Sequence, residues 1–109
     1  MVLDTSEAVR VFSGLAHGRR LEIFRYLVQA GYEGTSPGSI QKQFSLSPST
    51  LSFHLKSLKE IHLIDVRRVG RTLIYSVNFQ LMNAAIGYLL ENCCLGKRSQ
   101  TAGSDKSEL

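Results

Sequence analysis

Two adjacent cysteines, Cys93 and Cys94, are the residues whose type and spacing most directly suggest chemistry, and the chain has no other thiol. A pair of thiolates suits a soft, thiophilic centre. Trivalent arsenic or antimony prefers three sulfur ligands, so solvent, a small thiol or another atom would have to complete such a site. Zinc needs four ligands, and the last helical segment offers only Glu91 besides the thiols.

The same thiols leave two other interpretations open. Thiols with a lowered pKa oxidise reversibly, so the pair could act as a sensor of oxidants or persulfides. A stable disulfide between neighbours is not expected, because it would close a strained small ring. Alternatively, Cys93 belongs to the core of the last helix and Cys94 has no role.

The segment 47–58 carries a second set of suggestive residues, arranged with helical periodicity. Leu51, Leu55 and Leu58 fall on one side of a helix. The opposite side carries small hydroxyl groups and one cation, namely Ser49, Thr50, Ser52 and Lys56. Small side chains let a helix approach the floor of the DNA major groove, where hydroxyls bond to base edges or phosphates. A surface helix without such a task would carry more Glu and Lys.

Two aromatic residues lie within this segment. Phe53 falls on the hydroxyl side, where we expect its ring to contact a thymine methyl group in the major groove. The alternative is that the ring packs against a neighbouring element. His54 falls at the edge of the leucine side, and we expect it to be half-buried and bonded to backbone or phosphate rather than to a metal.

Three arginines, Arg67, Arg68 and Arg71, gather around a predicted turn. Apolar and polar residues alternate over 64–68 and again over 73–77, with one glycine in the turn between them. This pattern predicts a β-hairpin with a basic tip. We expect the arginines to grip phosphates or to enter the minor groove; the alternative is a solvated turn.

The net charge of +4 lies in the middle third of the chain. Residues 41–75 hold six basic and two acidic side chains, whereas residues 1–40 hold four of each and residues 76–109 three of each. A basic zone on a neutral background suits a polyanion such as DNA. Charge alone would fit a solubilising surface equally well.

Apolar periodicity and capping residues predict the elements that position these groups. Thr5 or Ser6 can cap a first helix. Ser47-Pro48 is a strong start signal for the helix that carries Phe53. Asn78 can begin a last helix, which we expect to end near Gly96. The expected order is helix 5–16, helix 19–30, loop 31–38, helix 39–44, helix 48–61, hairpin 64–77 and helix 79–95.

A short helix, a tight turn and a longer helix form a helix-turn-helix, and the hairpin that follows is a wing. We therefore expect a mainly α fold with a β-hairpin, a winged helix-turn-helix. Residues 1–96 would form one DNA-binding and dimerisation domain. Residues 97–109 would form a polar, disordered tail.

These features resemble the ArsR/SmtB family of metalloregulatory repressors. The resemblance covers about residues 7–95, and its motifs are SPSTLSFHLKSL (47–58), LIDVRRVGRTLIYSVN (63–78) and LAHGRRLEIF (15–24). It implies a homodimer built from the first and last helices, which represses its own operon until an inducer binds. Where many members carry a polar residue or a histidine on the recognition helix, this chain has Phe53.

The segment ENCCLG (91–96) is similar to the inducer site of arsenic-responsive members, whose cysteines end the last helix. Some such members have a third cysteine shortly afterwards, where this chain has only residues 97–100 (KRSQ). The resemblance implies a repressor that leaves double-stranded operator DNA when As(III) or Sb(III) binds Cys93 and Cys94, with no permanent cofactor. The residues expected at the DNA are Gln41, Ser47, Ser49, Thr50, Ser52, Phe53, Lys56, Arg67, Arg68 and Arg71.

Other classes of protein fit the sequence less well. The longest apolar run, 84–90, is too short to cross a bilayer, and acidic residues interrupt any signal peptide. With no disulfide framework, a cytoplasmic location is expected. The sequence shows neither a nucleophile with a nearby base nor a phosphate-binding loop, so an enzyme is not expected. A winged protein-interaction module that does not bind DNA is the alternative from another class, and the basic hairpin counts against it.

Overall fold

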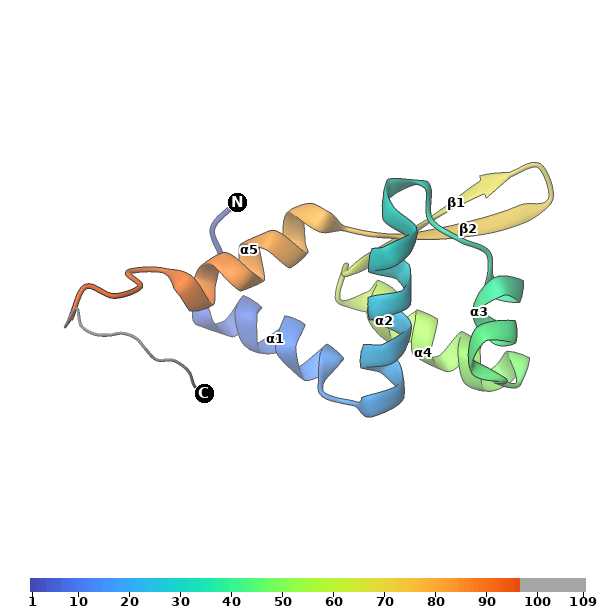
Figure 1. The fold of residues 1–109 in the computed structure, drawn as a ribbon, viewed down its shortest axis with the longest axis horizontal. Helices are drawn as coiled ribbons and strands as arrows, with labels where there is room; N and C mark the ends of the chain where they lie inside the picture. Colours follow the sequence, from blue (N-terminus) through green and yellow to red (C-terminus); the bar gives the residue numbers. More distant parts are fainter. Residues whose placement is uncertain (97–109) are drawn as a thin grey trace.

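The computed structural model describes residues 1–96, which form five α-helices, one 3-10 turn and a two-stranded antiparallel hairpin (Figure 1). In chain order the elements are α1 (Thr5–Leu15), α2 (Gly18–Ala30), η1 (Gly31–Glu33), α3 (Pro37–Phe44), α4 (Pro48–Glu60), β1 (Ile64–Val69), β2 (Thr72–Val77) and α5 (Phe79–Leu90). The predicted winged helix-turn-helix is confirmed. The predicted tail, 97–109, lies outside the described residues.

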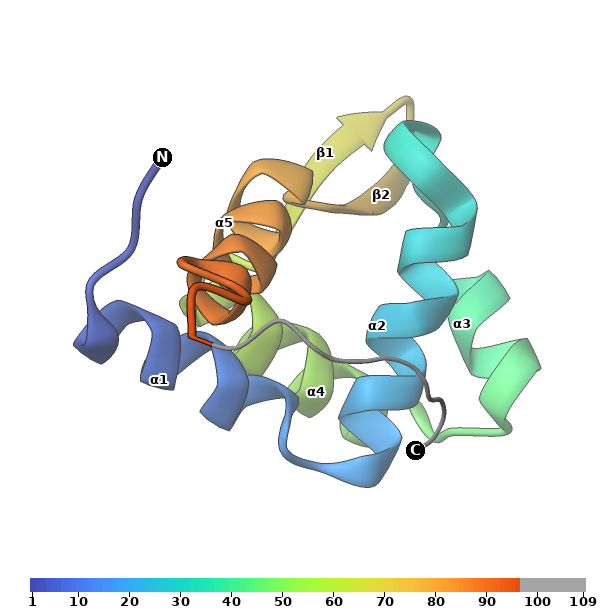
Figure 2. The ribbon, with the colours of Figure 1, turned by 60° about the vertical axis from the view of Figure 1, so that its left-hand side comes forward.

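The helices are arranged around one core. Figure 1 shows α1 and α5 together at one end of the domain and α3 with the hairpin at the other, and α1 and α5 again lie together in the turned view of Figure 2. A hydrogen bond of 2.5 Å between the Thr5 and Tyr88 hydroxyls joins α1 to α5. Ile23, Leu27 and Leu58, from α2 and α4, are fully buried between the two ends. In the described part of the chain no helix is long and apolar enough to cross a membrane.

The helix α4 forms as the sequence predicts. The Ser47 hydroxyl caps it by accepting a hydrogen bond from the Thr50 backbone N–H at 3.2 Å, and Pro48 occupies the first turn. The predicted apolar side, Leu51, Leu55 and Leu58, is buried. The opposite side is therefore free to face a partner.

Two helix starts differ from the sequence prediction. Asp4, rather than Thr5 or Ser6, caps α1 in a reciprocal pair with Glu7, whose carboxylate accepts from the Asp4 N–H at 2.9 Å. Likewise α3 begins at Pro37, behind a Ser36 cap, and not at Ser39. Ser36-Pro37 is the same start signal as at α4, but the glycines around it make the segment look like a loop.

The hairpin is held by its own turn and by the chain that leads into α3. Its register pairs Val69 with Thr72, so Gly70, with a φ of +64°, begins a two-residue turn. Thr35 adds a further bridge by exchanging two backbone hydrogen bonds with Tyr75, of 2.9 and 2.8 Å. The wing is therefore attached directly to the helix-turn-helix.

The last helix is shorter than predicted. Asn78 caps α5 as expected, accepting from the Leu81 N–H at 3.1 Å, but the helix ends at Leu90 rather than near Gly96. Asn92 and Cys94 have φ values of +61° and +68°, in the left-handed region that a helix excludes. Leu89 and Leu90 in the final turn of α5 are exposed and do not pack on the core. No tertiary contact among the described residues therefore supports a longer helix.

Candidate DNA interface and thiol site

The turn between α3 and α4 brings together two of the residues predicted at the DNA. Gln41 is half-buried, and its side-chain amide donates to the Leu46 carbonyl at 3.4 Å. Ser45 ends α3 in the left-handed conformation, with a φ of +54°. The structure thus places Gln41 as a support of the turn, whereas Ser47 stands exposed at the start of α4.

The first turn of α4 presents a small hydroxyl network. Ser47 Oγ donates to Thr50 Oγ1 at 2.9 Å and lies 3.4 Å from Ser49 Oγ. All three side chains are exposed, at the helix end where the backbone dipole favours an anion. A phosphate or a base edge could therefore meet several donors at once.

The middle of α4 continues this surface. Ser52 and Lys56 are exposed, and so is Phe53, with 61% of its surface accessible. The Phe53 ring is not isolated, because the Arg20 guanidinium lies 5.9 Å from its centroid. The Phe53 ring therefore lies exposed among serines and contacts one cation, Arg20.

His54 is more deeply placed than the sequence suggests, with only 5% of its surface exposed. It follows Leu51 and precedes Leu58 at helical spacing, so it faces inward, where its ring lies 5.0 Å from that of His17. Within residues 1–96 its Nδ1 has no hydrogen-bond partner, which corrects the expected half-buried, bonded histidine. Burial, then His17 and the nearby Arg20 and Arg19, lower the pKa of His54.

The three wing arginines are all exposed but do not form one cluster. Arg68 and Arg71 lie at the tip of the hairpin, where they can reach a polyanion. Arg67 points elsewhere, because its guanidinium donates to the Glu33 carbonyl of η1 at 2.8 Å. Arg67 therefore ties the wing to the rest of the domain.

The two thiols lie together in the turn that follows α5. The Cys93 and Cys94 sulfurs are 2.9 Å apart and both residues are exposed, so Cys93 is not part of a helical core. The hydrogen bond with Cys94, with the charge of that thiol and a small desolvation, raises the pKa of Cys93. Among residues 1–96 no group of three or more His, Cys, Asp or Glu side chains could hold a metal ion. The part of the chain that the structure describes thus offers two sulfur ligands and no third protein ligand.

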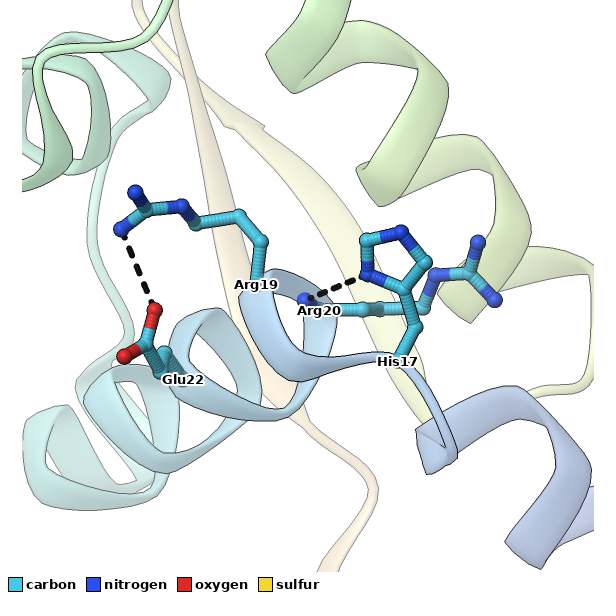
Figure 3. Close-up of polar contacts among 4 residues, drawn as sticks. All are labelled: His17, Arg19, Arg20 and Glu22. Atoms are coloured by element: carbon cyan, nitrogen blue, oxygen red, sulfur yellow. Dashed lines mark hydrogen bonds and ion pairs between the residues drawn. The ribbon is translucent and has the colours of Figure 1, made fainter.

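Sequence reasoning missed the part played by the start of α2. His17 caps this helix, its Nδ1 accepting from the Arg20 N–H at 3.5 Å. Figure 3 shows the next two side chains diverging, Arg19 toward Glu22, which it meets at 3.1 Å, and Arg20 toward α4. Consecutive cations in a first helical turn oppose the helix dipole. The unfavourable position of Arg19 and Arg20 in the first turn could have indicated from the sequence that their side chains have partners outside α2.

Comparison with known proteins agrees with this arrangement. The chain matches the family described as a helix-turn-helix domain over residues 15–67. It is 32% identical to the HTH-type transcriptional regulator YgaV of Escherichia coli, covering 84% of this chain and 90% of the relative. It is also 32% identical to the arsenical resistance operon repressor of Bacillus subtilis, covering 80% and 79%. The chain belongs to the ArsR family of helix-turn-helix transcriptional regulators.

The fold of the ArsR-family protein is similar to that of a solved structure. The homodimeric winged helix-turn-helix DNA-binding domain of Mb0332 from Mycobacterium bovis superposes with a TM-score of 0.63 at 28% identity, covering 78% of this chain and 74% of that one. The ArsR-family protein is therefore a DNA-binding transcriptional regulator. Its relatives are regulators of transcription and not enzymes.

Proposed function

We propose that this ArsR-family protein is a homodimeric cytoplasmic repressor that releases its operator when As(III) or Sb(III) binds Cys93 and Cys94. The observation that carries the proposal is the distance of 2.9 Å between two exposed sulfurs directly after α5. Sulfur ligands suit these thiophilic ions. A reducing compartment would keep both thiols available.

The binding step requires no oxidant. Arsenous acid, As(OH)₃, exchanges two As–O bonds for two As–S bonds, and each thiol proton leaves in a water molecule. Arsenic remains trivalent, and its third ligand is the remaining hydroxide or a small thiol. The exchange releases no free proton overall. The raised pKa of Cys93 slows thiolate attack on arsenic and on an oxidant alike, so it does not separate the two interpretations of the thiols.

Dimerisation through α1 and α5 is supported by what these helices leave exposed. Val9 on α1 and Ile86, Leu89 and Leu90 on α5 are each about half or more exposed. An apolar patch of this kind marks an interface. Two recognition helices in a two-fold dimer would then enter successive major grooves, about 34–36 Å apart.

Release follows from the attachment of the thiol turn to α5. A chelated ion would fix the turn and reorganise the end of α5, which is bonded to α1 through Tyr88 and Thr5. The two half-sites would then no longer match the spacing of the grooves. A coupling of about 1–3 kcal/mol at each of the two sites is sufficient for such a response.

The test is a titration of the protein on fluorescent DNA from upstream of its gene, with and without arsenite. The parent chain should bind and be released, while Cys93→Ser, Cys94→Ser should bind and remain bound. Asn92→Gly is the matched control, because glycine accepts the φ of +61° in the same turn and both sulfurs remain. Continued release of the double serine variant by arsenite would place the sensor elsewhere.

Peroxide and polysulfide form the second arm of the same experiment. The exposed thiols could instead be oxidised reversibly, in that one thiol and one peroxide give a sulfenic acid and one water. If these reagents release the parent chain and arsenite does not, the protein is a thiol-redox or persulfide sensor. If the parent chain does not bind the DNA at all, the interaction-module alternative holds.

A further inference from the structure

Arg20 connects three elements of the domain. Its Nη1 donates to the Gly14 carbonyl at the end of α1, at 3.2 Å. Its guanidinium carbon lies 5.9 Å from the centre of the Phe53 ring on α4. In Figure 3 its side chain runs past His17 toward α4. One side chain on α2 thus reaches both α1 and the exposed side of the recognition helix.

In the described part of the chain the Phe53 ring has few other contacts that could fix its orientation. It is 61% exposed, and apart from Lys56, whose long side chain is also exposed, its neighbours on the same side of α4 are short hydroxyl residues that cannot hold an aromatic ring. The other ring contact is an edge arrangement with His54, at 5.6 Å between centroids. A guanidinium over the ring attracts it, and the planar Arg group does so better than an ammonium.

Arg20 is not placed to bind a DNA phosphate itself. The residue is half-buried, and its Nη1 is already bonded to Gly14. Its Nε is buried without a partner among the described residues, so it too is turned away from solvent. Two of its three guanidinium nitrogens are therefore not available to a phosphate, and the side chain contributes chiefly geometry to the interface.

We propose that Arg20 is a positioning residue for base readout, which holds the Phe53 ring in the orientation that meets a thymine methyl group. The inference rests on the proposed contact between Phe53 and DNA. Burial of one methyl group corresponds to about a four-fold change in affinity. Arg20 would control whether this preference is expressed without changing the number of phosphates contacted.

The experiment compares operator DNA with the same DNA carrying deoxyuridine for thymidine within the footprint, which removes only the methyl groups. The parent chain should prefer thymine by about four-fold for each contacted base. Arg20→Lys and Phe53→Ala should each abolish most of this preference, and the double variant should lose no more than either single variant. The slope of log affinity against log salt should not change in Arg20→Lys, because the charge and the phosphate contacts remain.

Arg19→Lys is the matched control. Arg19 is the preceding residue on α2 but faces Glu22 and the Phe44 ring, 5.6 Å away on α3, so the thymine preference should survive its replacement. If Arg20→Lys unfolds, Phe53→Leu tests the same contact by changing the ring instead of the guanidinium. Leucine retains apolar bulk but no aromatic face, so its thymine preference should fall as that of Phe53→Ala does.

Three results would overturn the inference. Arg20→Lys with an intact thymine preference would show that Phe53 needs no brace, and a fall in salt slope in Arg20→Ala by about 0.9 would make Arg20 a phosphate ligand. A parent chain without any thymine preference would also overturn it. Arsenite release, measured on the same DNA, reports the proposed function separately.

Discussion

Ile61 and Gly14 are in direct contact where α1 crosses the end of α4, and the Ile61 Cδ1 atom occupies the space that a methyl group on Gly14 would need. A glycine within a helix normally lowers stability. Here it permits the close approach of the helix that carries the readout residues to the helix that we expect at the dimer interface.

Gly14→Ala should therefore destabilise the protein. Overpacking costs about 1–3 kcal/mol, and the better helix propensity of alanine returns about 0.5–1 kcal/mol, so a net loss of about 1 kcal/mol is expected in urea unfolding. Gly18→Ala is the control, since nothing lies within 4 Å of its added methyl group. Equal stability of the two variants would contradict the close contact.

Stability should fall in mild acid because of His54. Its folded-state pKa is lowered, chiefly by burial and then by His17, Arg20 and Arg19, while the unfolded value is about 6.5. The free energy of unfolding is therefore at its full value above about pH 6.5 and declines as the pH falls toward the lower folded pKa. Urea unfolding at pH 7.5 and pH 5.5 measures the difference.

His54→Leu should remove part of that pH dependence, because the group that must stay neutral is gone. The control is His62→Asn, at an exposed histidine with a φ of +64° that asparagine tolerates. If the pH dependence disappears in the His62 variant and persists in the His54 variant, the assignment of the effect to His54 is wrong.

The wing arginines should separate by their salt dependence. Arg71→Ala should weaken DNA binding and reduce the slope of log affinity against log salt by about 0.9, as expected for one lost phosphate contact. Arg67→Ala should weaken binding with the slope unchanged, because its guanidinium is bonded to the Glu33 carbonyl. Binding isotherms at four salt concentrations decide this, and a reduced slope in Arg67→Ala would show that the tether releases in the complex.

Gly34→Ala should be more damaging than other glycine replacements. Gly34 has φ and ψ values of +76° and −166°, a region almost restricted to glycine, and an added methyl group would overlap the Tyr75 carbonyl oxygen. We expect a loss of about 3 kcal/mol in urea unfolding. Gly38→Ala in α3 is the control, since its methyl group would meet only Ser36 Oγ, at 3.8 Å.

The sequence predicts the parts of this molecule that depend on local signals. Ser47-Pro48 and the leucines that follow fix α4 and the face it presents, and the alternation around Gly70 gives the hairpin. The same local logic was available at Asp4 and at Ser36-Pro37. There the competing signals, further hydroxyl residues and neighbouring glycines, led to a later cap for α1 and a later start for α3 than the structure has.

The sequence does not predict contacts between distant segments. Arg67 reads as a tip residue until η1, 34 positions earlier, is placed beside it. His54 reads as a boundary residue until the start of α2 covers it. The sequence predicts too long an α5, because apolar residues continue past Leu90 although they no longer pack on the core.

The bridge between Thr35 and Tyr75 has a consequence for the DNA sequence itself. Because the wing is hydrogen-bonded to the segment that enters the helix-turn-helix, the bases that we expect α4 to read and the backbone that we expect the wing to contact should be separated by a fixed distance. An operator with one base pair inserted between these positions moves one set of contacts by about 3.4 Å and rotates it about the DNA axis. Operators of this protein are therefore expected to vary in sequence far more readily than in length.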